Sequence, residues 1–299
     1  MKNKLALHMC YWSGTEIGNS LEQIISYTAE TGVDSLELGP DMFLNLDRQR
    51  RKDLLHRIED HGLSVSVNGG LMNERNDTSS PDPAIRRAGI EHCRRVLEAC
   101  ADMRSPYWSG LMHSAWCLKP DMENPQECKR RTWDRSVEAM KTVTKIAADY
   151  GVVCAIEIVN RYEHFLLNTA KDGIDFCGEV GSPYCKLCLD VFHMSIEEND
   201  MPSAVMETQN RGYLACIHLG ETNRRIPTGG PTNINWSRFG NAVRDGKYSG
   251  TMVFEPLQFS GASTAAKTCL WRDVADPNDL NGLVVNGQKA VSFMRGLLE

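Results

Sequence analysis

The stretch "AIEIVNRYEH", residues 155–164, begins as a buried strand and ends in a dense polar cluster. Residues 155–158 are apolar except for Glu157, which has no cation beside it in the sequence. Residues 160–164 are then mostly polar or charged. A carboxylate among buried apolar residues is unfavourable unless it is paired or binds a metal. The stretch therefore indicates a strand that carries a functional group at its end.

Short apolar runs of this kind recur along the chain. Few alternate strictly, as expected for strands that are covered on both faces. Stretches of helical period separate them, for example from Ile85 to Cys100 and from Trp133 to Ala147. With the first stretch included, the eight runs are residues 5–10, 35–38, 64–67, 107–111, 152–158, 186–191, 214–219 and 251–256.

Eight strands that alternate with helices predict an α/β fold, a (β/α)8 TIM barrel with a parallel sheet. An open doubly wound sheet is the alternative, but no G-x-G-x-x-G follows the first strand. No linker or low-complexity stretch divides the chain. We therefore expect a single TIM-barrel domain over residues 1–299.

Composition narrows the class of protein. The formal net charge of −6 does not favour a nucleic-acid partner, which usually needs a basic face. The first residues form too short an apolar run for a signal peptide, and no segment reaches transmembrane length. Most of the 11 cysteines lie in apolar runs, which favours a reducing compartment. We expect a cytoplasmic protein without a membrane partner, and no zinc or redox site at Cys185 and Cys188.

Polar residues end the last four predicted strands. In barrels of this type the active site lies at the carboxyl ends of the strands. A single carboxylate there is more often a helix cap or an ion-pair partner, but four consecutive strands favour a shared metal site. Oxygen donors with one imidazole suit Mn(II), Mg(II) or Co(II). The four residues are Glu157, Asp190, His218 and Glu255. Glu221 is interpreted as a solvated loop charge.

Several motifs resemble those of the ketose 3-epimerases, the D-tagatose 3-epimerase and D-allulose (psicose) 3-epimerase group of xylose isomerase-like TIM barrels. They are "YWS", "EIVNRYE", "LDVFHMSIEE", "HLGETNR", "FEP" and "WRD", in the order of that family and over essentially the whole chain. The resemblance implies one divalent metal, Mn(II) before Co(II) or Mg(II), bound by the four residues above. It also implies that Glu157 and Glu255 are the acid/base pair.

The resemblance extends to expected sugar contacts. Glu163, His193 and Arg224 match positions that bind the sugar's oxygens, and Trp116 matches a tryptophan that packs against the substrate. The chain departs from the pattern at His8, Asn68, Met112 and His113, which we expect near the ketone or the distal end of the substrate. His8 and Asn68 are therefore included as substrate-binding candidates, and reaction class is better defined than the identity of the ketose.

The implied reaction is metal-dependent epimerisation of free ketoses at carbon 3 through an enediolate. The proton at this carbon is weakly acidic, so a cation must stabilise the developing charge, and two glutamates must act on opposite faces. Aldose–ketose isomerisation at the same metal site is the main alternative. A non-catalytic sugar-binding barrel and an endonuclease IV-like enzyme are less favoured. Similar proteins form homodimers or homotetramers, which we expect here.

Overall fold

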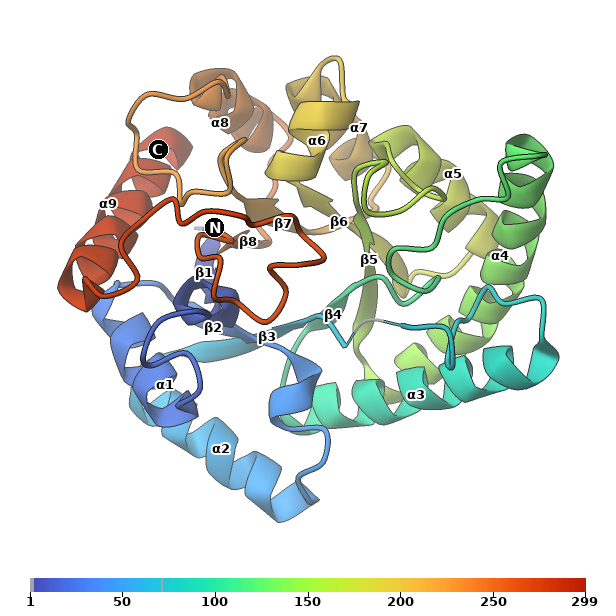
Figure 1. Ribbon diagram of the computed structural model, residues 1–299, viewed down its shortest axis with the longest axis horizontal. Coiled ribbons are helices and arrows are strands. Elements are labelled where there is room, and N and C mark those ends of the chain that lie inside the picture. The colour runs from blue at the N-terminus through green and yellow to red at the C-terminus, as the bar shows by residue number, and fades with distance from the viewer. Residues whose placement is uncertain (1–2, 71) are drawn as a thin grey trace.

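The computed structural model describes residues 3–70 and 72–299 and contains a closed barrel of parallel strands (Figure 1). Each strand pairs with the next, and β8 closes the barrel against β1 with Leu7 beside Phe254. The TIM-barrel prediction is confirmed, and the open-sheet alternative is wrong. The strands are β1 Lys4–His8, β2 Ser35–Leu38, β3 Ser64–Asn68, β4 Tyr107–Gly110, β5 Val153–Ile158, β6 Cys185–Asp190, β7 Leu214–Leu219 and β8 Thr251–Phe254.

Helices surround the barrel on its outside (Figure 1). Their ends follow local sequence chemistry: Asp82 caps α3 by accepting the N–H of Ala84, and α4 stops at Gly151, whose φ of 68° is left-handed. The helices are α1 Leu21–Glu30, α2 Arg48–Asp60, α3 Pro83–Asp102, α4 Pro125–Tyr150, α5 Ala170–Val180, α6 Val191–Glu197, α7 Met201–Asn210, α8 Trp236–Asp245 and α9 Leu280–Leu298, with 3-10 turns η1 Met9–Trp12 and η2 Pro40–Met42.

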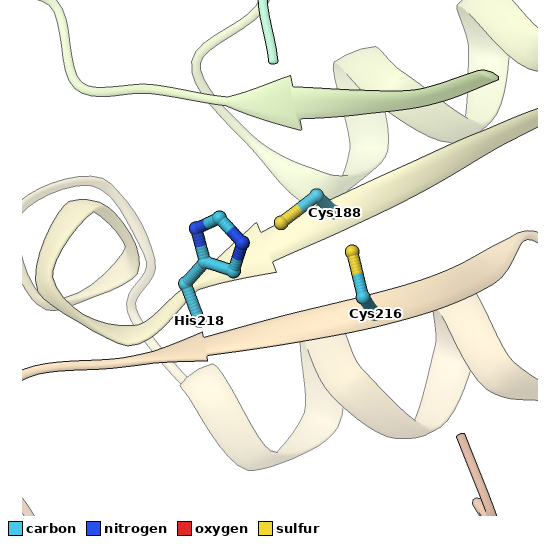
Figure 2. A group of neighbouring side chains, drawn as sticks. All are labelled: Cys188, Cys216 and His218. Carbon is cyan, nitrogen blue, oxygen red and sulfur yellow. The ribbon is translucent and has the colours of Figure 1, made fainter. Parts of the chain in front are cut away.

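The barrel interior is layered. A small inner cluster takes one inward-facing residue from each of four neighbouring strands, namely Tyr107, Ala155, Cys188 and Cys216. Side chains alternate between the two faces of a strand, so the residue two positions further along points into the same interior. On β5, β6 and β7 these next residues are Glu157, Asp190 and His218. Figure 2 shows Cys216 and His218, two successive inward-facing residues of β7.

The segment between β8 and α9, residues 255–279, passes in front of the strands in Figure 1. Several of its residues line the cavity at the carboxyl ends of the strands, among them Leu257, Thr264 and Lys267. Within the described part of the chain, no helix combines the length and the apolar character needed to cross a membrane. The single-domain interpretation of residues 1–299 stays a prediction.

Candidate active site

Glu157, Asp190, His218 and Glu255 converge at the carboxyl end of the barrel, as the sequence predicts. One donor atom from each lies within 4.8 Å of the others. His218 Nδ1 is 2.8 Å from Glu255 Oε2 and 3.6 Å from Glu157 Oε1. The pairing of β6 with β7 places Asp190 directly beside His218. The four residues thus form one cluster, although they come from four strands.

A cavity of about 500 Å³ opens above this cluster. Glu157 and Glu255 line the cavity, whereas Asp190 and His218 are buried beneath it, with at most 1% of either residue exposed. A small molecule in the cavity would therefore contact the two glutamates. The aspartate and the histidine belong with them to a group of donor atoms that could hold an ion.

The three carboxyl groups of the cluster have pKa values that are shifted in different directions. Burial, followed by the charge of Glu255, raises the pKa of Glu157 to about 7. Burial also raises the pKa of Asp190 to about 6, although Arg224 opposes the shift. Burial acts on Glu255 in the same direction, but the charge and hydrogen bond of His218 hold its pKa well below the ordinary range.

These donors fit a divalent cation. Three carboxylates and one imidazole are mainly hard ligands, and burial raises the pKa of Glu157 and Asp190 because ionised carboxyl groups are costly in the interior. A cation of charge two would offset this cost. The fit supports the predicted ligand set.

The raised pKa of Glu157 predicts an unusual pH dependence for protein stripped of cations. The folded state keeps a proton that the unfolded state releases above about pH 4.3, so this group's contribution to stability is lost as pH rises through about 7. Glu157→Gln should therefore stabilise the cation-free protein at pH 8, by up to about 3 kcal/mol for a shift of this size.

Urea denaturation of both proteins in chelator, at pH 5.5 and pH 8, measures this effect. The gain from Glu157→Gln should be larger at pH 8. A variant that is less stable than the wild type at pH 8 would contradict the raised pKa.

Glu163, Arg224 and Trp116 form a linked group on the cavity wall. Arg224 Nη2 donates to Glu163 Oε1 at 2.9 Å, and the indole Nε1 of Trp116 donates to Glu163 Oε2 at 3.2 Å. The guanidinium of Arg224 lies 3.5 Å from the ring centre of Phe192, and its backbone has a left-handed φ of 65°. These contacts hold the charged groups in fixed positions.

His193 also lines the cavity, and its hydrogen bonds define its ring protons. Its Nδ1 accepts the backbone N–H of Asn160 at 3.1 Å, so Nε2 carries the proton of the neutral ring. Burial, reinforced by Arg224, lowers the pKa of His193 well below its ordinary value. His193 is thus a neutral hydrogen-bond donor.

Asn68 and His8 line the same cavity. Asn68 Nδ2 donates to Glu255 Oε1 at 2.9 Å, so this residue touches the acid/base candidate directly. His8 Nδ1 accepts the N–H of Cys10 at 3.0 Å, which fixes the ring at the end of β1. All six residues that we predict to contact the sugar therefore line the cavity, and their roles in binding stay predictions.

Three sequence-based interpretations need correction. Met112 and His113 were expected near the substrate, but they do not line the cavity. Leu111 is the residue of this segment that lines it. Glu221 is not solvated: it is 9% exposed and accepts the indole N–H of Trp236 at 2.9 Å. It holds the loop after β7 in place.

The C-x-x-C motif is divided between two faces of β6. Cys185 Sγ lies 3.7 Å from Cys177 Sγ, whereas Cys188 lies in the barrel interior with Cys216 and His218 (Figure 2). This separation agrees with the expectation that the motif forms no joint site. It follows from the two-residue alternation of side chains along a strand.

Sequence reasoning missed two buried residues next to the cluster, Glu37 and Tyr107. Glu37 is fully buried, and its Oε2 lies 3.3 Å from His218 Nε2. The signal was available, because Glu37 interrupts the apolar run "SLEL" as Glu157 interrupts "AIEI". Tyr107 gave no such signal, since tyrosine is common in strands.

Comparisons with known proteins agree with this architecture. The family model of the xylose isomerase-like TIM barrel matches residues 25–271. The chain is 31% identical to a D-psicose 3-epimerase of Ruminiclostridium cellulolyticum, over 99% of this chain and 98% of the relative. It is 30% identical to an L-ribulose 3-epimerase of Mesorhizobium japonicum, over 91% of this chain and 88% of the relative.

A solved structure matches this chain at the same sequence identity and over the same extent. The crystal structure of a D-psicose 3-epimerase with D-tagatose, from Clostridium cellulolyticum H10, has a TM-score of 0.90 to this chain at 31% identity, with 99% of each chain covered. The match runs through all eight strands that build the cavity and its acidic cluster. The chain therefore belongs to the xylose isomerase-like TIM barrel family and, within it, to the ketose 3-epimerases, an isomerase class of enzyme.

Proposed function

We propose that this protein is a metal-dependent epimerase that inverts carbon 3 of free ketoses, with Glu157 and Glu255 as its acid/base pair. The observation that carries the proposal is the position of these two carboxylates at the floor of the cavity, in one cluster with Asp190 and His218 whose donor atoms lie within 4.8 Å of one another. Two carboxylates that face the same bound sugar can serve as its proton acceptor and proton donor. Family membership supports the reaction class.

In the proposed site, Glu157, Asp190, His218 and Glu255 would hold the cation. Mn(II) is the expected ion, and Co(II) and Mg(II) accept the same donors. When bound, the cation would supply positive charge beside the substrate oxygens that become negative as carbon 3 loses its proton. The two glutamates have different surroundings, since Asn68 donates to Glu255 and Glu157 has no such contact among the described residues.

The chain's own groups would perform the remaining tasks. One glutamate removes the proton from one face of the sugar, and the other returns a proton on the opposite face. His193, as a neutral N–H donor, and Arg224, as a fixed cation, would bind sugar oxygens. Trp116 would pack against the sugar and keep water from the reacting carbon, while Glu163 orients Arg224.

Arg224→Ala tests the contact with the sugar. Removing one charged donor should lower kcat/KM by roughly 10- to 100-fold, mainly through KM, since a hydrogen bond to a charged group contributes about 1.5–3 kcal/mol. Steady-state kinetics on the best ketose measures the change. Arg224→Lys is the matched variant, because it keeps the charge but loses the fork. Unchanged efficiency in Arg224→Ala would remove this residue from the substrate site.

The function itself is tested with protein that is stripped by chelator and reloaded with Mn(II). The protein is incubated in heavy water with fructose, tagatose, ribulose and sorbose, and the sugars are followed by NMR. Deuterium at carbon 3 together with the epimeric ketose would support the proposal. Label at carbon 1 or 2 with an aldose product would make the protein an aldose–ketose isomerase. Tight sugar binding without exchange would make it a sugar-binding barrel.

Two other expectations stay predictions. A homodimer or homotetramer and a cytoplasmic location are consistent with the chain, and sedimentation and fractionation of the native protein would test them. The two compared relatives are named for a hexose and for a pentose, so the panel of ketoses above contains both.

A further inference from the structure

A chain of buried polar groups extends from the acidic cluster into the barrel interior. The hydroxyl of Tyr107 on β4 donates to Glu37 Oε1 on β2 at 3.0 Å. Glu37 Oε2 lies 3.3 Å from His218 Nε2 on β7. No more than 4% of any of the three residues is exposed. This chain lies beneath the cavity, so it does not touch a molecule bound there.

Glu37 is otherwise difficult to explain. A buried carboxylate needs a partner, and the described residues place no lysine or arginine within ion-pair distance of it. Neither Glu37 Oε2 nor His218 Nε2 has a hydrogen-bond partner within residues 3–70 and 72–299, and the 3.3 Å between them is an ion-pair distance. The two atoms are therefore placed to satisfy each other.

The surroundings of His218 Nε2 make Glu37 the strongest acceptor on that side of the ring. Figure 2 shows the thiols of Cys188 and Cys216 beside the ring, and both residues are fully buried. Thiols accept hydrogen bonds weakly, whereas a carboxylate accepts them strongly. On the opposite side of the ring, Nδ1 faces Glu255 at 2.8 Å.

We propose that Glu37, oriented by Tyr107, is a positioning residue for His218. With the cation bound, its carboxylate would accept the N–H of Nε2, which fixes the ring orientation and leaves Nδ1 to bind the cation together with Glu157 and Glu255. A histidine that binds a metal through one nitrogen is generally held in this way through the other. The inference rests on the proposed metal site, and it assigns to Glu37 and Tyr107 a role without substrate contact.

The first measurement uses protein labelled with ¹⁵N in its histidines and loaded with Mg(II), which is diamagnetic. The nitrogen shifts report the hydrogen bond made by the Nε2–H of His218, and the signals are assigned by their loss in His218→Ala. We expect a hydrogen-bonded Nε2–H in the wild type and a shifted Nε2–H signal in Glu37→Gln, whose side chain has the same shape without the charge. Cys216→Ala, which changes a thiol beside the same ring, should keep the wild-type signal.

The second measurement is Mn(II) affinity, read from the electron paramagnetic resonance signal of free Mn(II). Glu37→Gln should weaken binding by about 10- to 100-fold, as loss of an outer partner of a metal-binding histidine generally does. Tyr107→Phe should weaken it by a few-fold, because Glu37 remains but loses one of its two contacts. This milder variant decides the matter if Glu37→Gln does not fold.

Either of two results would overturn the proposal: an unchanged Nε2–H signal of His218 in Glu37→Gln, or equal losses of affinity in Glu37→Gln and Cys216→Ala, which would indicate general packing. Failure of the proposed function is distinguishable. A wild-type protein that binds Mn(II) but epimerises no ketose leaves the role of Glu37 intact. A wild-type protein that binds neither Mn(II) nor Mg(II) would overturn the metal site and, with it, the role of Glu37.

Discussion

Glu157→Gln and Glu255→Gln are each expected to lower the rate of epimerisation by roughly 10²- to 10⁴-fold, the range for loss of a positioned acid or base. The physical reason is geometric. Inversion requires a proton to leave one face of carbon 3 and another to arrive on the opposite face, and one fixed carboxylate reaches only one face. Each variant therefore keeps half of the machinery.

The proton transfer that each variant retains can be measured by hydrogen exchange at carbon 3. In heavy water, a variant that retains the base for one epimer should exchange the carbon 3 proton of that epimer without forming the other. The second variant should show the complementary preference. NMR of both purified epimers with each variant gives four exchange rates, and two should be much larger than the other two.

The control for these variants is Glu198→Gln, which makes the same chemical change at a half-buried glutamate that accepts the N–H of Ala170 outside the cavity. It should epimerise at the wild-type rate. If both Glu157→Gln and Glu255→Gln exchanged both epimers equally, a single group would serve both faces and the two-glutamate assignment would fail.

Much of the fold was predictable because the barrel is built from local patterns. Each apolar run that the sequence marks as a strand is a strand, and helices begin after Asp82 and end at Gly151, residue types that favour these two positions. The convergence of Glu157, Asp190, His218 and Glu255 was predictable for a related reason. Carboxyl ends of parallel strands meet at one rim, so polar residues at strand ends are brought together by topology alone.

The remaining parts of the site depend on contacts between distant segments. Asn68 reaches Glu255 across the barrel, and the ring of His193 is oriented by the backbone of Asn160. No spacing in the sequence reveals such pairs. Likewise, Leu111 lines the cavity while His113 does not. Both residues follow β4 in a turn, where no strand alternation in the sequence indicates which side chain points inward.

Glu37 shows another limit of prediction from the sequence. Like Glu157, Glu37 is an acidic residue in an apolar run, so both residues gave the same signal in the sequence. However, Glu37 belongs to β2, whereas the predicted cluster was drawn from the ends of the last four strands. Its meaning depends on the 3.3 Å separation from His218, which comes from closure of the barrel.

Asp190→Asn is expected to weaken Mn(II) binding by roughly two orders of magnitude, because affinity in oxygen-rich sites follows the number of charged ligands. Asp190 also has a second role. Its Oδ1 accepts the N–H of His193 at 3.1 Å and so caps α6. Asparagine caps helices as well as aspartate does, so the substitution removes the charge and keeps the cap and the position of His193.

Asp190→Ala is the matched comparison, because it removes both the charge and the cap. It should bind Mn(II) as weakly as the asparagine variant and also lose about 1 kcal/mol of stability relative to it. Urea denaturation in chelator separates the two effects. Wild-type protein should gain about 2.7 kcal/mol at a Mn(II) concentration of 100 times its Kd, and neither variant should gain as much at that concentration.

Activity then distinguishes a ligand from an acid or base. Asp190 lies beneath the cavity and takes no part in the proposed proton transfer, so kcat of Asp190→Asn should recover substantially as Mn(II) is raised toward saturation. Glu157→Gln should stay slow at every Mn(II) concentration, because its missing group handles the proton. If Asp190→Asn bound Mn(II) as tightly as the wild type, the cation would lie elsewhere. If it bound weakly and stayed inactive at saturation, Asp190 would contribute to the reaction itself.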